Sequence, residues 1–162
     1  ERFEFLSRQR DDLMAAKDKI LEAIDEMDDI MNMQSGMLGV SGISSDARDI
    51  EDGCKEGNPA ALLTAEVYVN RVINVVGGYY AQLGGADAIV FTGGIGENDT
   101  NMRKMICDRL SVAFGIQLDE ELNGKTRGKE VLLSTAESKV AVWLIPTNEE
   151  LMIARDTYRL IA

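Results

Sequence analysis

The sequence predicts an α/β fold that follows one long N-terminal helix. Residues 1 to about 31 contain no Gly or Pro and are rich in strong helix formers. Beyond them, segments with helical periodicity alternate with short apolar runs that contain β-branched residues. Glycine-rich turns separate several of these segments, and this alternation is typical of a sheet covered by helices.

The composition excludes several classes of function. The 162 residues are 45% hydrophobic, which is enough to build a core, and the net charge of −11 argues against a nucleic-acid binder. The absence of His excludes His-based acid–base catalysis, Ser-His and Cys-His nucleophile pairs, and zinc sites that need imidazole. No apolar run reaches the roughly 20 residues of a membrane span, so we expect no membrane partner.

Cysteine usage and the first residues predict a cytoplasmic location. Cys54 and Cys107 show no metal-binding or redox spacing and are expected to be reduced thiols. The opening segment ERFEFLSRQR has no signal-peptide pattern. It also lacks an initiator Met, which suggests a partial or processed chain.

The first helix carries a heptad stripe. Leu6, Leu13, Ile20 and Met27 recur every seven residues, and a second, weaker row lies three positions further on, formed by Gln9, Ala16, Ala23 and Ile30. The stripe fits either an amphipathic helix that packs on its own domain or a coiled-coil arm that seeks a partner. We therefore divide the chain into a helical arm, residues 1–30, and a folded lobe, residues 31–162.

Two helices are predicted next, after a Gly/Ser-rich boundary at residues 34–42. The first covers about 48–55, with Ser45 or Asp46 as its cap. The second starts at Asn58-Pro59 and ends at the glycine pair 84–85, because Asn is a good N-cap and Pro suits the first helical position. Its expected apolar face comprises Leu62, Val69, Val72, Val76 and Leu83.

The remaining elements include a buried strand and a glycine turn. Residues 86–92 predict the strand, residues 93–96 the turn, and residues 97–100 open a helix that continues to about 114. Residues 115–129 are polar and predict a loop. Strands at 130–134 and 139–145 and a terminal helix capped by Thr147 or Asn148 complete the pattern.

Three segments are candidates for chemistry, and each also has a purely structural interpretation. The glycine turn lets a backbone approach an anionic or nucleotide ligand, or is simply a tight connection between strand and helix. Asp46 and Arg48 offer an acceptor and a planar cation, or form a capped helix start with a surface ion pair. Residues 146–150 carry carboxylates that suit Mg²⁺, or that stabilise a helix N-terminus.

Three long motifs resemble acetate kinases. SGMLGVSGISSDARDI at residues 35–50, FTGGIGEN at 91–98 and IPTNEELMIARDT at 145–157 match segments of that family in order and spacing, and the resemblance runs from about residue 27 to the end. It implies reversible transfer of a phosphoryl group from ATP to acetate, giving acetyl phosphate and ADP. It also implies an actin-like, sugar-kinase-like ATPase fold, of which this chain would be most of the C-terminal lobe.

The resemblance also implies site residues and cofactors. ATP or ADP and Mg²⁺ are the expected cofactors, and the homodimer of the family is expected here. Glu149 would act in Mg²⁺ binding. The adenosine pocket would include Asp46, Ala47 and Arg48, and the nucleotide cradle would comprise Gly94, Ile95, Gly96, Glu97 and Asn98. No catalytic residue is assigned within this chain.

The departures from the family lead us to expect little turnover from this chain alone. The family's His-containing glycine loop and the acetate-site and catalytic groups of its N-terminal domain have no counterpart here. The choice among acetate, propionate and butyrate is therefore left open.

Residues 1–28 resemble a different family, in a coil-to-head segment of SMC-type chromosome-segregation ATPases. The alternative function of the chain is a non-catalytic dimerisation module built on a kinase-derived scaffold.

Overall fold

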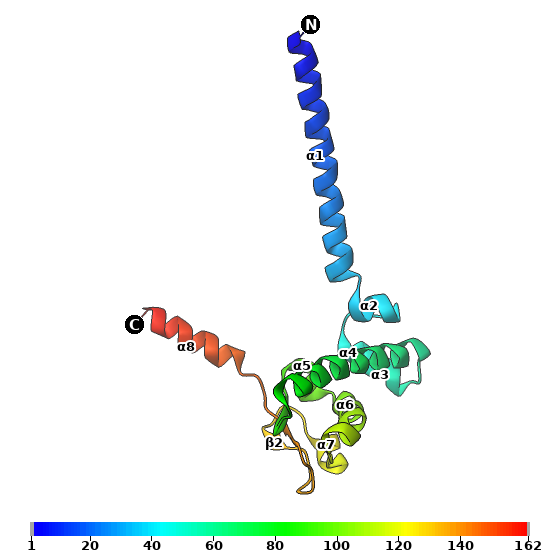
Figure 1. Cartoon of the computed structure of the whole chain (residues 1–162), viewed down its shortest axis with the longest axis vertical. Helices are drawn as coiled ribbons and strands as arrows, with labels where there is room; N and C mark the ends of the chain where they lie inside the picture. Colours follow the sequence, from blue (N-terminus) through cyan, green and yellow to red (C-terminus); the bar gives the residue numbers. More distant parts are fainter. Residues whose placement is uncertain (1, 162) are drawn as a thin grey trace. The chain divides into compact units, whose positions relative to one another are not determined.

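The computed structural model describes residues 2–161, which form two compact units. One unit extends to Thr64 and the other begins at Ala65. The helices and strands follow in chain order (Figure 1): α1 Arg2–Met33, α2 Gly36–Ser41, α3 Ala47–Lys55, α4 Pro59–Leu83, β1 Ala88–Phe91, α5 Gly93–Asn98, α6 Thr100–Phe114, α7 Glu120–Lys125, β2 Val131–Leu132, β3 Ala141–Leu144 and α8 Glu149–Ile161. The α/β class is confirmed, and the boundary between residues 30 and 31 stays a prediction.

The first unit is built from helices. The predicted long helix is present as α1, and none of its described side chains is buried. The Gly/Ser stretch is more ordered than expected, since residues 36–41 form α2, which ends at Gly42 in the left-handed conformation. Asp46 caps α3 by accepting a hydrogen bond from the Arg48 amide at 2.9 Å. Asn58 caps α4 in the same way, as predicted, through the Ala60 amide at 2.9 Å.

The second unit contains a three-stranded sheet with the order β1-β3-β2. β1 runs parallel to β3 with Phe91 opposite Leu144, and β2 runs antiparallel to β3. The prediction that the first strand is buried is wrong, because every residue of β1 is exposed or half-buried. β1 is an edge strand among the described residues, whereas β3 is central and buries Val142 and Leu144 on one face.

Helix α6 supplies much of the core of this unit. Its apolar residues Met102, Ile106, Leu110 and Phe114 recur every four positions and are buried. The helix ends at Gly115, whose φ of +67° suits a residue without a side chain. The predicted loop 115–129 contains a further helix, α7, which is capped by Asp119 and lies beside α6 (Figure 1).

The apolar face of α4 differs from the prediction. Val69 is buried, but Leu62 and Leu83 are exposed. The buried positions in this part of the helix are instead the small residues Ala61, Thr64 and Ala65 together with Val69. Close contact with a neighbouring surface favours small side chains, so the size of the residue decides burial here as much as its hydrophobicity does.

Candidate functional site

The carboxyl ends of β1 and β3 lie at one edge of the sheet. The two strands are parallel neighbours, so the segments that leave them start side by side. The Ile145 amide donates a hydrogen bond to the Phe91 carbonyl at 3.0 Å, which extends the pairing to the last residue of β1. The structure therefore brings the GGIGEN segment and residues 145–149 together, as their positions after two strands allow.

Glu97 joins these two segments. One carboxylate oxygen, Oε1, accepts hydrogen bonds from the Gly93 amide at 2.9 Å and from the Thr147 amide at 2.7 Å. The Thr147 hydroxyl accepts from the Gly93 amide at 3.2 Å and also pairs with the Thr92 hydroxyl. Two turns that are about 50 residues apart in the sequence are thus held by one carboxylate and one hydroxyl.

The GGIGEN segment is a short helix and not an open turn. Residues 93–98 form α5, and Asp99 separates it from α6 by accepting a hydrogen bond from the Met102 amide at 2.8 Å. The prediction that residues 97–100 open a helix to about residue 114 is confirmed by α6, but the turn predicted at residues 93–96 is wrong, because these residues belong to α5. The Gly93 amide at the start of α5 donates to the Glu97 carboxylate and to the Thr147 hydroxyl.

The three glycines of this segment differ in backbone conformation and in the space around them. Gly93 has a φ of +70°, which a residue with a side chain rarely adopts. A Cβ on Gly96 would lie 3.3 Å from the Phe91 carbonyl carbon, so this position is closely packed against the end of β1. A Cβ on Gly94 would meet nothing within 4 Å, and the backbone there is open to a ligand.

The other two residues of the predicted cradle differ in surroundings. Asn98 is exposed and donates to the Gly94 carbonyl at 3.0 Å, which supports the turn. Ile95 is half-buried and lines an apolar cavity of about 200 Å³ together with Phe91, Ile106 and Leu110. Ile95 therefore faces the packed side of the segment, whereas Gly94 and Asn98 lie on its exposed side.

The predicted adenosine residues belong to the first unit and form a local ion pair. The Arg48 guanidinium donates hydrogen bonds to the Asp46 carboxylate, with Nη2 at 2.5 Å from Oδ2 and Nε at 3.1 Å from both oxygens. This hydrogen bond lowers the pKa of Asp46 to about 2. The Arg48 side chain stays 86% exposed, so the flat face of its guanidinium can still stack on a base. Ala47 is the first residue of α3 and is half-buried.

Glu149 lies in the first turn of α8 and is exposed. Asn148 caps this helix by accepting a hydrogen bond from the Leu151 amide at 3.2 Å. Within residues 2–161, no three His, Cys, Asp or Glu side chains are grouped so that they could hold a metal ion. A single carboxylate completed by phosphate oxygens and water is a common way to hold Mg²⁺, and Glu149 fits that arrangement.

Arg103 is an important residue that sequence reasoning missed. Its guanidinium is fully buried and donates to the Gly96 carbonyl at 2.8 Å, to Asn123 Oδ1 at 2.8 Å and to the Thr126 carbonyl at 2.7 Å. Burial lowers the pKa of Arg103, but an arginine remains charged at neutral pH. The available signal was its position four residues before Cys107, on the apolar face of α6.

None of the helices among residues 2–161 is long and apolar enough to cross a membrane.

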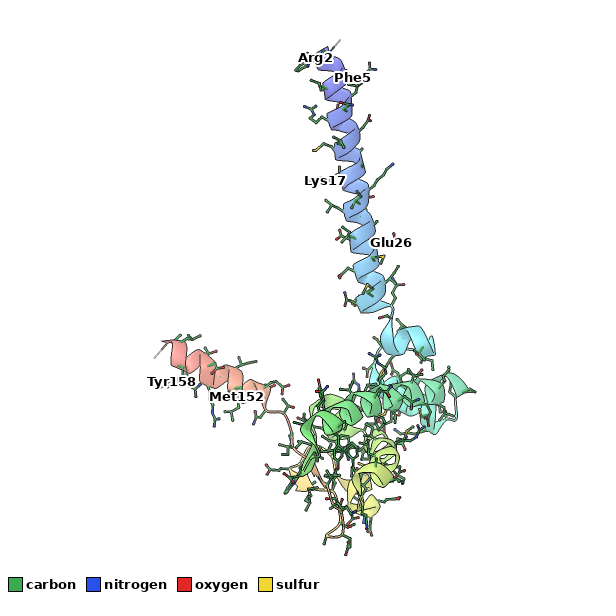
Figure 2. All side chains as sticks on the ribbon, in the orientation of Figure 1. Arg2, Phe5, Lys17, Glu26, Met152 and Tyr158 are labelled. Carbon is green, nitrogen blue, oxygen red and sulfur yellow. The ribbon has the colours of Figure 1, made fainter. Side chains whose placement is uncertain are left out.

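The side chains of α8 are exposed along its length, and Figure 2 shows Met152 and Tyr158 projecting from it.

Known proteins are similar to this chain over most of its length. The acetokinase family model matches residues 13–155, which begins earlier than the residue 27 estimated from the motifs. The acetate kinase of Treponema denticola is 54% identical over 137 residues, covering 85% of this chain and 34% of that protein. The chain thus spans about a third of the length of the curated relatives it matches.

Solved structures agree with this similarity. The acetate kinase of Porphyromonas gingivalis superimposes with a TM-score of 0.75 at 46% identity, covering 83% of this chain and 34% of that one. A propionate kinase from Francisella tularensis superimposes with a TM-score of 0.72 at 36% identity, covering 81% of this chain and 33% of that one. Motifs, family model and fold agree, and the chain belongs to the acetokinase family.

Proposed function

We propose that this chain supplies the nucleotide and Mg²⁺ side of an acetate kinase. The complete reaction is reversible phosphoryl transfer from ATP to acetate, giving acetyl phosphate and ADP. The observation that carries the proposal is the edge of the sheet where GGIGEN and residues 145–149 meet, in a chain that belongs to the acetokinase family. The actin-like ATPase fold is part of the same proposal.

Each part of the site has a proposed role. Asp46, Ala47 and Arg48 contact the adenosine, with the Arg48 guanidinium stacking on the base. The segment from Gly94 to Asn98 holds the nucleotide, and the open space at Gly94 supports a close backbone approach. Glu149 contributes a carboxylate oxygen to Mg²⁺, which when bound would neutralise charge on the phosphates.

We further propose that this chain has little turnover by itself. Phosphoryl transfer is catalysed mainly by positioning and by electrostatic stabilisation of the transferring group, so groups on both sides of that group are needed. The chain contains no His, and the resemblance places the acetate-site groups of the family outside it.

Acyl specificity stays open, and the proposed assembly is a cytoplasmic homodimer. The alternative, a non-catalytic dimerisation module, is not favoured, because the family match covers most of the chain.

Calorimetric titration of the 162-residue chain with Mg-ADP tests nucleotide binding. We expect binding heat in the parent chain and a loss of affinity in Arg48→Ala and Gly96→Val. The second variant places a branched side chain where a Cβ is already 3.3 Å from backbone. Gly77→Ala is the matched control, because a Cβ at that position in α4 meets nothing within 4 Å. Absence of heat in the parent chain would refute the binding proposal.

An acetyl-phosphate assay of the same preparation tests turnover. We expect rates at the background level. A rate typical of a complete enzyme would refute the proposal that this chain lacks essential groups.

A further inference from the structure

We propose that Glu97 is a positioning residue that couples the nucleotide cradle to the segment carrying Glu149, and that it does not itself contact the nucleotide. This inference rests on the proposed function and refines it, because the family resemblance places Glu97 among the nucleotide-binding residues. Its basis is the pair of hydrogen bonds that Oε1 accepts from the Gly93 and Thr147 amides, at 2.9 and 2.7 Å.

The two amides belong to the two halves of the proposed site. Gly93 begins α5, two residues after the end of β1. Thr147 lies three residues after the end of β3 and two residues before Glu149. Parallel pairing brings the strand ends together, but it does not fix the turns beyond them. The Glu97 carboxylate supplies that connection together with the Thr147 hydroxyl, which bonds the Gly93 amide and the Thr92 hydroxyl.

The chemistry of the contact favours a carboxylate. An ionised oxygen accepts two N–H groups more strongly than a neutral one does, and such bonds are short. The side chain of Glu97 extends back along α5 toward Gly93, which is the direction that helical side chains ordinarily take. The bonded oxygen is therefore directed toward the protein backbone and is already engaged by two donors.

The connection predicts a specific effect on Mg²⁺ dependence. A nucleotide at the GGIGEN segment and a cation at Glu149 would contact each other through the phosphates. Each would then strengthen the binding of the other only when the two segments keep their spacing. Such mutual strengthening is a coupling free energy between two sites. Removing Glu97 should lower the gain in affinity that Mg²⁺ produces more than it lowers affinity for the free nucleotide.

The experiment is a calorimetric titration of the whole chain with ADP, with and without MgCl₂. Glu97→Ala should reduce the Mg²⁺-dependent gain in affinity by about fivefold or more. Glu97→Gln keeps an acceptor oxygen at the same reach and should restore most of that gain. Glu97→Asp is one methylene shorter and should resemble Glu97→Ala. Glu130→Ala removes an exposed glutamate outside the site and is the control.

Amide hydrogen exchange of Gly93 and Thr147 provides a readout that needs no ligand. Both amides should be protected in the parent chain and in Glu97→Gln, and both should exchange faster in Glu97→Ala. The proposal is overturned if Glu97→Ala leaves both amides protected. It is also overturned if Glu97→Gln loses the Mg²⁺ effect as completely as Glu97→Ala while both amides stay protected, because the charge would then act directly on the ligand.

The two proposals fail in different ways. A parent chain that binds no ADP, with or without Mg²⁺, refutes the proposed function. In that case, faster exchange of both amides in Glu97→Ala still supports the connection between the turns. ADP binding whose Mg²⁺ dependence is unchanged in Glu97→Ala refutes the positioning role and leaves the proposed function standing.

Discussion

Helices α1 and α6 have similar helical sequences but opposite surroundings. α1 spans 32 residues and buries none of its described side chains, whereas α6 spans 15 residues and buries six. Leu13 in α1 is 71% exposed, and Leu110 in α6 is 3% exposed. Helix propensity and periodicity predict both helices, but they do not reveal which surface covers an apolar stripe.

The difference has a clear physical origin in α6. Its apolar residues lie in the core, and its one buried cation, Arg103, donates to four carbonyl or amide oxygens. In α1 the heptad residues Leu6, Leu13, Ile20 and Met27 are all exposed. The two interpretations of the α1 stripe, packing on its own domain or pairing with a partner, stay predictions.

The largest effect is expected at the buried arginine. Arg103→Ala should lower the free energy of unfolding by about 3 kcal/mol or more, because it leaves a cavity and buried acceptors without their donor. Arg8→Ala, in exposed α1, should change it by less than about 0.5 kcal/mol. Urea denaturation followed by circular dichroism measures both. Equal effects of the two variants would contradict the contrast between α1 and α6.

A smaller effect is expected from a matched pair of leucines. Leu110→Ala should cost about 2–4 kcal/mol, since the side chain leaves a packed core. Leu13→Ala should cost less than about 0.5 kcal/mol in the same denaturation experiment. A large loss at Leu13 would show that the α1 stripe is covered in solution. Repeating the measurement at several protein concentrations would then separate packing within one chain from pairing between chains.

The sequence predicted features that depend on neighbouring residues better than features that depend on distant parts of the chain. Caps were predictable because they depend on one side chain and a nearby amide. Asn58 caps as expected, and Asp46 and Asn148 are each one of the two candidates that the sequence offered. The glycine motif was located correctly, but the short helix α5 was missed. The Gly93 amide at its start is bonded by Glu97 within the helix and also by Thr147, which is 54 residues away in the sequence.

The sequence located the two segments of the candidate site, but it did not reveal the hydrogen bonds between them. Placing GGIGEN and residues 145–149 after two strands required only the apolar runs. The role of Glu97 between them depends on parallel pairing of those strands, and no local pattern reveals such pairing. The burial of β1 was mispredicted for a related reason, since an apolar run does not distinguish an edge strand from a central one.

The smallest effect is expected at the exposed pair on α3, which sharpens the contrast with the buried Arg103. The hydrogen bond from Arg48 lowers the pKa of Asp46 to about 2 from its ordinary value of 3.8. Because the pKa of the folded state is the lower one, the pair stabilises the fold above about pH 4 and loses that contribution as the pH falls toward 2. Its exposure to solvent keeps the contribution small.

Carboxyl chemical shifts measured by NMR against pH test this assignment directly. Asp46 should titrate near pH 2 in the parent chain and closer to its ordinary value of 3.8 in Arg48→Ala, because the donor of the hydrogen bond is gone. Lys55→Ala removes another exposed cation of α3 that pairs with Glu51 and Asp52, and it should leave the Asp46 titration unchanged. A titration of Asp46 that did not respond to Arg48→Ala would mean that the ion pair does not persist in solution. The guanidinium would then be free to rotate, and the orientation proposed for stacking on a base would lose its support.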